Sequence, residues 1–149
     1  MNKFDAKKFL SAQEGAYKQA LAEIKSGKKT SHWIWYIFPQ MKGLGYSSNS
    51  QNYAIESLNE ARQYLADEVL RKRLVEISEA LLSQEGSAEK ILGKVDAMKV
   101  RSCMTLFREA DPKTEVFGKV LDKFYDGKAD EKTLKLVREQ QRRDKEGTW

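Results

Sequence analysis

Residues 30–53, TSHWIWYIFPQMKGLGYSSNSQNY, combine more rare residue types than any other part of the chain. This stretch holds the only histidine and one of the two prolines, and it ends in a turn rich in glycine, serine and asparagine. Residues 32–38 are almost continuously apolar, so periodicity alone does not separate a strand from a buried helix. We expect a short buried helix here, capped by Thr30 or Ser31, because the neighbouring segments are helical and no partner strand is evident. Pro39 ends this helix, since proline has no N–H to donate.

The segments on both sides carry helix signals. Residues 4–24 contain an apolar stripe at helical spacing, which Gly15 divides into a short helix and a longer one. Further along, a capping residue precedes each apolar stripe. Its polar side chain can accept a hydrogen bond from a backbone N–H group in the first turn of the helix that follows. The expected starts are Asn49 or Ser50, Ser57 in a capping box with Glu60, Asp67, Ser87, Asp111 followed by Pro112, and Asp130. The chain is therefore predicted to be all-α, a single compact array of about eight or nine short helices.

The broadest apolar face lies on residues 95–110. Its members follow one another at spacings of three and four residues and are Ala97, Val100, Met104 and Phe107. A face of this width is typical of a helix that is buried on most of its circumference. We expect this helix at the centre of the core, with Leu74 from a neighbouring stripe buried against it.

Length and composition set further bounds. A chain of 149 residues, 40% hydrophobic and 33% charged, is typical of one globular domain, here residues 1–149. The lone Cys103 excludes an internal disulfide and indicates a reducing compartment. With no apolar leader and no long apolar run, we expect a cytoplasmic protein. Residues 138–149 form a basic tail that is expected to fray beyond Gln141.

A series of motifs gives a resemblance to one family. In order, they are SHWIWYIFPQMKGLG (31–45), YAIESLNEARQYL (53–65), VLRKRLVEISEALL (69–82), ILGKVDAMKVRSCMTLF (91–107) and VFGKVLDKFYDGKADEKTL (116–134). Together they resemble the bacterial family labelled domain of unknown function 1810, over about residues 4–137. The resemblance implies a mainly helical fold and no established activity. The label calpastatin, often given to such proteins, does not fit, because those inhibitors stay disordered until they bind.

Most motif-based chemistry is excluded. One histidine and one distant cysteine are too few for a zinc site, and no acidic cluster marks a magnesium site, so we predict no metal. The pair Gly43 and Gly45 lacks the Gly-Lys-Ser/Thr of a phosphate-binding loop, and the GxSxG and HExxH motifs are absent. The sequence identifies no cofactor.

The candidate site is centred on His32. Histidine exchanges protons near neutral pH, so His32 is the candidate general acid or base; the structural alternative is an imidazole that bonds a carbonyl or carboxylate and fixes the helix start. Arg101 interrupts the apolar face of its helix, where it extends to solvent, pairs with a buried carboxylate, or binds an anionic ligand with its forked donors. The candidate ligand-binding residues are Trp33, Tyr36, Gln40, Gly43, Gly45, Ser47, Asn49, Ser50 and Arg101.

Three function classes follow from these residues. The favoured hypothesis is a pocket around His32 and Arg101 that binds a small, planar anion, such as a nucleotide fragment, with or without catalysis. The second is a protein-interaction module without catalysis. The third is a nucleic-acid binder that uses basic residues, although a net charge of +5 favours anionic partners only mildly. The third would use Lys25, Lys28, Lys29, Arg142 and Arg143. The sequence predicts no oligomeric state.

Overall fold

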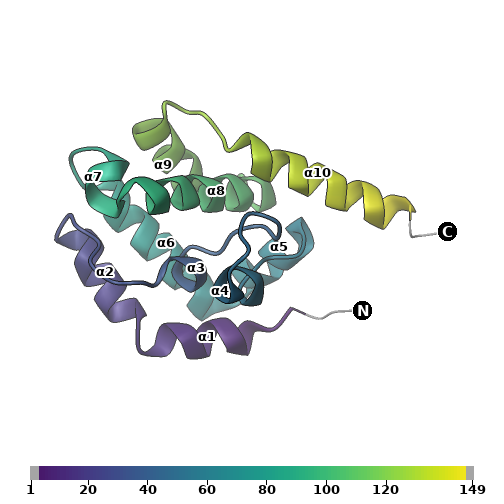
Figure 1. Ribbon diagram of the computed structural model, residues 1–149, viewed down its shortest axis with the longest axis horizontal. Coiled ribbons are helices and arrows are strands. Elements are labelled where there is room, and N and C mark those ends of the chain that lie inside the picture. Colours follow the sequence, from purple (N-terminus) through teal and green to yellow (C-terminus); the bar gives the residue numbers. More distant parts are fainter. Residues whose placement is uncertain (1–3, 147–149) are drawn as a thin grey trace.

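The computed structural model describes residues 4–146, which form ten helices and no strand (Figure 1). They are α1 (Ala6–Glu14), α2 (Tyr17–Lys25), α3 (Ile34–Ile37), α4 (Ser48–Asn52), α5 (Leu58–Ala66), α6 (Glu68–Leu82), α7 (Ala88–Leu92), α8 (Lys94–Ala110), α9 (Val116–Tyr125) and α10 (Glu131–Glu146). The all-α prediction is confirmed, and the number of helices is slightly higher than expected. None of the helices in the described part of the chain is long and apolar enough to span a membrane.

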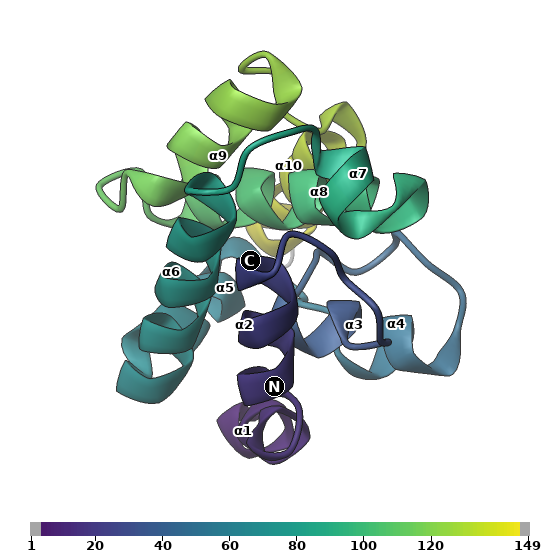
Figure 2. The same cartoon turned by 90° about the vertical axis from the view of Figure 1, so that its left-hand side faces the viewer.

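Helix α8 lies at the centre of the arrangement. It packs against α3, α5, α7, α9 and α10, while α6 joins α2, α5 and α9 beside it. Figure 2 shows α7, α8 and α9 in the upper half of the molecule, and α1 at the bottom with α2 directly above it. The broad apolar face predicted for residues 95–110 is the reason for this position, because a helix with such a face must be covered from several directions.

The core contains a chain of aromatic rings that crosses four helices. The ring of Tyr64 lies 5.3 Å from that of Phe9 and 5.3 Å from that of Phe107, which lies 5.9 Å from Phe117. The buried phenol of Tyr64 accepts a hydrogen bond of 2.9 Å from the Gln13 amide. Leu74 and Met104 are also buried, so the three expected core residues are confirmed.

Several predicted helix starts are confirmed. The side chains of Ser57, Asp67 and Ser87 each accept a hydrogen bond from an N–H in the first turn that follows. Asp130 does the same for α10, where its Oδ2 accepts from the N–H of Thr133 at 3.0 Å. Helix α4 begins one residue earlier than expected, after a cap by Ser47.

The expected helix start at Asp111 and Pro112 is wrong. The Asp111 carboxylate accepts hydrogen bonds from the hydroxyl of Thr114 at 2.7 Å and from Arg71 at 3.3 Å. These contacts close a turn after α8, and α9 begins only at Val116. The carboxylate is engaged by a distant arginine, which local sequence signals do not show.

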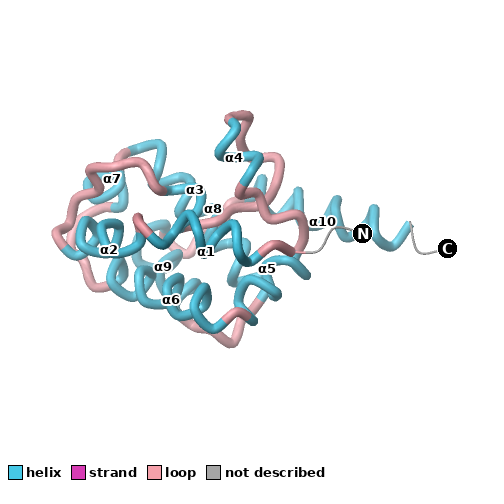
Figure 3. The backbone as a smooth tube through the Cα atoms, turned by 90° about the horizontal axis from the view of Figure 1, so that it is seen from below, coloured by secondary structure: helices cyan, strands magenta, loops and turns pink. Residues whose placement is uncertain are grey.

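The C-terminal part contains the last helix. Residues 142–146 continue α10, while residues 147–149 of the predicted basic tail lie outside the described part. Figure 1 shows α10 extending away from the rest of the molecule. Near its start, α10 packs on the loop before α4, which Figure 3 shows projecting from the helical body. A Cβ added at Gly43, whose φ is 108°, would lie 3.1 Å from the side chain of Leu136, so this approach requires glycine.

Replacing Phe107 with alanine is expected to lower the free energy of unfolding by about 3–5 kcal/mol, because the ring is fully buried between two other rings. Urea denaturation measures this loss, and Val69→Ala on the exposed face of α6 serves as the control. A loss below about 1 kcal/mol would show that Phe107 is not a core residue.

Candidate functional site

The loop between α2 and α3 is held by the carboxylate of Glu23, which is 7% exposed. Its Oε1 accepts hydrogen bonds from the backbone N–H groups of Thr30 at 2.7 Å and Ser31 at 3.0 Å, and from the indole Nε1 of Trp33 at 3.0 Å. Its Oε2 accepts from the Gln19 amide at 3.0 Å and from the Ser31 hydroxyl. Thr30 and Ser31 therefore donate to Glu23 instead of capping the next helix. The helix expected over residues 32–38 is accordingly shorter and begins at Ile34.

These hydrogen bonds determine the charge state of Glu23. Burial by itself raises the pKa of a carboxyl group, but the donors Ser31, Thr30, Trp33 and Gln19 outweigh it and lower the pKa of Glu23 from 4.5 to about 2. The group is thus ionised in the folded protein throughout the neutral and mildly acidic range.

A second anchor ties the same loop to α8. The Lys29 side chain is 6% exposed, and its Nζ lies 2.7 Å from Oδ2 of Asp96, donates to the Ser31 carbonyl and sits 4.8 Å from the centre of the Trp33 ring. The other oxygen of Asp96 lies 3.5 Å from Nζ of Lys99. The Lys99 ammonium also lies 4.6 Å from the centre of the Trp35 ring. Two ammonium groups therefore share one carboxylate, and each lies over an indole.

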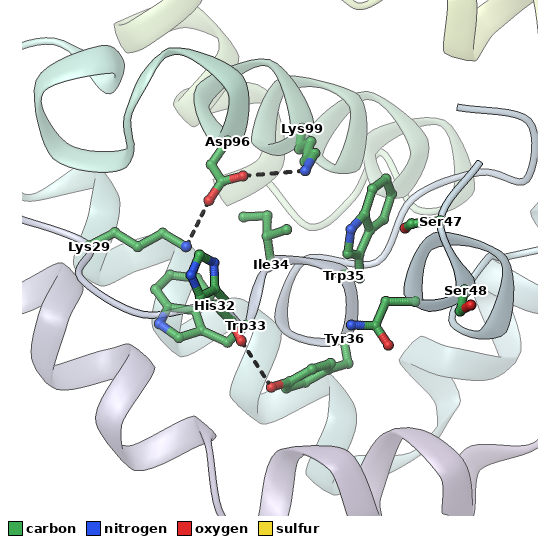
Figure 4. A pocket seen from close by; sticks show the side chains of 11 residues that line it. Lys29, His32, Trp33, Ile34, Trp35, Tyr36, Ser47, Ser48, Asp96 and Lys99 are labelled. Atoms are coloured by element: carbon green, nitrogen blue, oxygen red, sulfur yellow. Dashed lines mark hydrogen bonds and ion pairs between the residues drawn. The ribbon is translucent and has the colours of Figure 1, made fainter. Parts of the chain in front are cut away.

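Between these groups lies a solvent-open cleft of about 450 Å³. Figure 4 shows His32 and Trp35 on either side of Ile34, with Asp96 and Lys99 on one side of this row and Tyr36 on the other. Ser47, Ser48 and Asn49 from the start of α4 complete the lining. The formal charge of the cleft is +1, from Lys29, Lys99 and Asp96, with His32 neutral.

The cleft unites five of the predicted site residues: His32, Trp33, Tyr36, Ser47 and Asn49. The His32 side chain is exposed, and no hydrogen bond to its imidazole is found within residues 4–146, so the structural alternative of an imidazole locking the helix start does not hold. Trp33 is 2% exposed and serves mainly as an anchor. Burial and neighbouring Tyr53 raise the pKa of Tyr36, whose phenol donates to the His32 carbonyl at 3.3 Å.

Arg101 does not line this cleft: His32 and Arg101 lie in two neighbouring hollows that share Lys99, where a single cavity is predicted. The guanidinium of Arg101 donates from Nε to the carbonyl of Lys128 and from Nη2 to that of Ala129, both at 2.9 Å. Arg101 thus fixes the loop between α9 and α10. Together with Gln40, it lines a neighbouring hollow of about 310 Å³.

Two of the remaining predicted residues, Gly45 and Ser50, hold the loop before α4 next to the cleft. A Cβ added at Gly45 would lie 2.9 Å from the Trp35 ring and 2.8 Å from the Ser50 side chain, so glycine lets the loop close on this tryptophan. Ser50 is buried, and its hydroxyl donates to the Ser47 carbonyl at 2.8 Å. Gly43 packs against Leu136 and does not line the cleft.

Comparisons with known proteins agree with this architecture. A family model described as a protein of unknown function (DUF1810) matches residues 3–137. The chain belongs to this family. A crystal structure of the conserved hypothetical protein Rv1873 from Mycobacterium tuberculosis is similar, with a TM-score of 0.89 and 38% identity over 92% of this chain and 99% of that one. A search of curated proteins gave no match. These findings confirm the resemblance and assign no activity to this DUF1810 protein.

Six residues that line the cleft are not among the predicted site residues: Lys29, Ile34, Trp35, Ser48, Asp96 and Lys99. On a continuous helix over residues 32–38, Trp35 would point away from the face that carries Trp33 and Tyr36. The spacing of Asp96 and Lys99, three residues apart on one helix face, was the available local signal. Their proximity to residues 29–36 depends on the tertiary fold.

No group of three or more His, Cys, Asp and Glu side chains within residues 4–146 is placed to hold a metal ion. Cys103 is fully buried, and burial raises the pKa of its thiol well above the usual value.

The cleft offers ammonium, imidazole, phenol, hydroxyl and amide groups for hydrogen bonding, and indole and imidazole rings for stacking.

Replacing Glu23 with glutamine is expected to lower the free energy of unfolding by about 2–3 kcal/mol near neutral pH, because its amide leaves buried donors unpaired. Since the folded pKa lies below 4.5, the stability that the carboxylate contributes is present above pH 4.5 and is lost as the pH falls toward about 2. Urea denaturation at about pH 7 and about pH 3 should therefore show a smaller change with pH for the variant than for the wild type. Glu85→Gln, at an exposed position, is the control. Equal pH dependence in Glu23→Gln and wild type would contradict this role.

Proposed function

We propose that the cleft binds a small anion that carries a flat ring, with His32 beside the ligand as a proton donor or acceptor. The observation that carries this proposal is the excess of ammonium groups beside flat side chains: Lys29 and Lys99 share the single carboxylate of Asp96. Lys99 is the available cation, since its side chain is 25% exposed and its ion pair is long, at 3.5 Å.

The shape of the cleft supports a planar ligand. A ring placed over Ile34 meets the imidazole of His32 on one side and the indole of Trp35 on the other (Figure 4). Flat rings stack on such side chains in offset or edge-to-face contacts. An anionic group on this ring then reaches Lys99 beside the indole. The ligand class is therefore an aromatic phosphate or carboxylate, of which a nucleoside monophosphate is the representative.

The exposed imidazole adds a chemical group to this binding site. His32 belongs to the loop that Glu23 and Lys29 fix, so its backbone is held while its side chain stays exposed. Catalysis by His32 would take the form of proton transfer to or from a ligand in the cleft.

The nucleic-acid alternative receives less support from the structure. Lys29 is buried in its ion pair, which removes one member of the proposed basic set. Lys25 lies at the end of α2, while Arg142 and Arg143 lie near the end of α10 at the opposite end of the molecule (Figure 1). These residues do not form one continuous surface.

Replacing Lys99 with methionine should weaken the binding of adenosine 5′-monophosphate by about tenfold or more, since it removes a charge-assisted contact and keeps the length of the side chain. Thermal-shift and calorimetric titrations of wild type, Lys99→Met and His32→Gln measure this. Trp35→Leu should weaken the binding of adenosine 5′-monophosphate but leave the binding of ribose 5-phosphate little changed. Only adenosine 5′-monophosphate carries a flat aromatic ring that can stack on the indole.

The matched control is Lys119→Met on α9, where the lysine is 60% exposed and pairs with Glu115. The affinity of Lys119→Met for adenosine 5′-monophosphate should equal that of the wild type. If no aromatic phosphate or carboxylate binds the wild type, or if Lys99→Met binds as tightly as Lys119→Met, the proposed function fails.

A further inference from the structure

We infer that the ligand extends past Lys99 into the neighbouring hollow, and that it is a conjugate in which an anionic group links a flat ring to an apolar chain. This inference rests on the proposed function of the His32 cleft. Its basis is geometric continuity: Lys99 lines both the cleft of about 450 Å³ and the hollow of about 310 Å³.

The hollow offers an apolar surface that the fold leaves uncovered. Val95 and Met98, which lie three residues apart on α8, are 64% and 66% exposed, and they belong to the few large apolar side chains that are exposed within residues 4–146. Leu44, from the loop before α4, also lines the hollow. Lys99 follows Val95 by one helical turn, so α8 presents a cation and an apolar pair on the same face.

The polar groups of the hollow are mostly engaged within the protein. Arg101 is bound to the carbonyls of the loop between α9 and α10. Oδ2 of Asp130 accepts a hydrogen bond from the Ser102 hydroxyl at 3.1 Å and another from the backbone N–H of Thr133, in the first turn of α10. The Gln40 amide donates to the Phe38 carbonyl at 3.4 Å. What remains for a ligand is the apolar wall, together with the cations at its edge.

These observations assign one part of the ligand to each region. The ring occupies the space between His32 and Trp35, and the anionic group lies at Lys99, where the two spaces meet. The apolar chain lies along Val95 and Met98, where its burial adds affinity in proportion to the area removed from water. A cationic chain is disfavoured, because Lys99 and Lys132 line the hollow.

The test compares the methyl and hexyl esters of adenosine 5′-monophosphate, which have the same ring and the same charge. Isothermal titration of the wild type should show that the hexyl ester binds about tenfold or more tightly than the methyl ester. In Val95→Ser/Met98→Ser this advantage should disappear, while the affinity for the methyl ester stays within about twofold of wild type. Val69→Ser, at an exposed apolar position of α6, is the control and should keep the advantage.

Each result decides between the two proposals. If the methyl ester binds and the hexyl ester binds no more tightly, the extension is wrong and the cleft proposal stands. If the hexyl ester is favoured but the double serine variant keeps the advantage, the chain lies elsewhere and the extension is also wrong. If neither ester binds, the proposed function fails and the extension fails with it. Hexyl phosphate should bind more weakly than the hexyl ester, because it lacks the ring; equal affinity would overturn the assignment of the ring to the cleft.

Discussion

The buried carboxylate of Glu23 is the interaction on which the candidate site depends. Residues 30 and 31 lie outside any helix, so their N–H groups need an acceptor that regular structure does not supply. Glu23 accepts both and also holds the indole of Trp33. With Trp33 fixed inward, the adjacent His32 is exposed, and Trp35 reaches the cleft from the helix that follows. One side chain of α2 thereby determines which aromatic residues are core and which are available to a ligand.

The link from Lys29 to Asp96 extends this local order to the centre of the fold. Lys29 belongs to the loop that Glu23 holds, whereas Asp96 belongs to α8, the helix around which the core is built. Asp96 also orients Lys99, so a cation on α8 stands above a ring carried by α3. The cleft therefore joins two parts of the chain that are more than sixty residues apart in sequence. Its geometry depends on packing and on two partly buried charges.

The fold followed from local patterns, but the site did so only in part. Capping residues such as Ser57 and Asp67 act within one helical turn, and the stripe ending in Phe107 is continuous in sequence, so both could be recognised. His32 and the turn at Ser47 were located because rare residues cluster there. Arg101 could not be assigned, because its carbonyl partners come from a loop 27 and 28 residues away. Glu23 was overlooked, since a single glutamate on an amphipathic helix resembles a solvent-exposed residue.

The central claim is that Glu23 holds residues 30–33 against the core and thereby shapes the cleft. Hydrogen exchange of wild type and Glu23→Gln, followed by NMR under native conditions, tests it most directly. If Glu23 holds this segment, the Ser31 amide and the Trp33 indole N–H lose protection in the variant, while amides in the middle of α8 keep theirs. Unchanged protection of both the Ser31 amide and the Trp33 indole N–H would show that other contacts hold residues 30–33, and would contradict this role of Glu23.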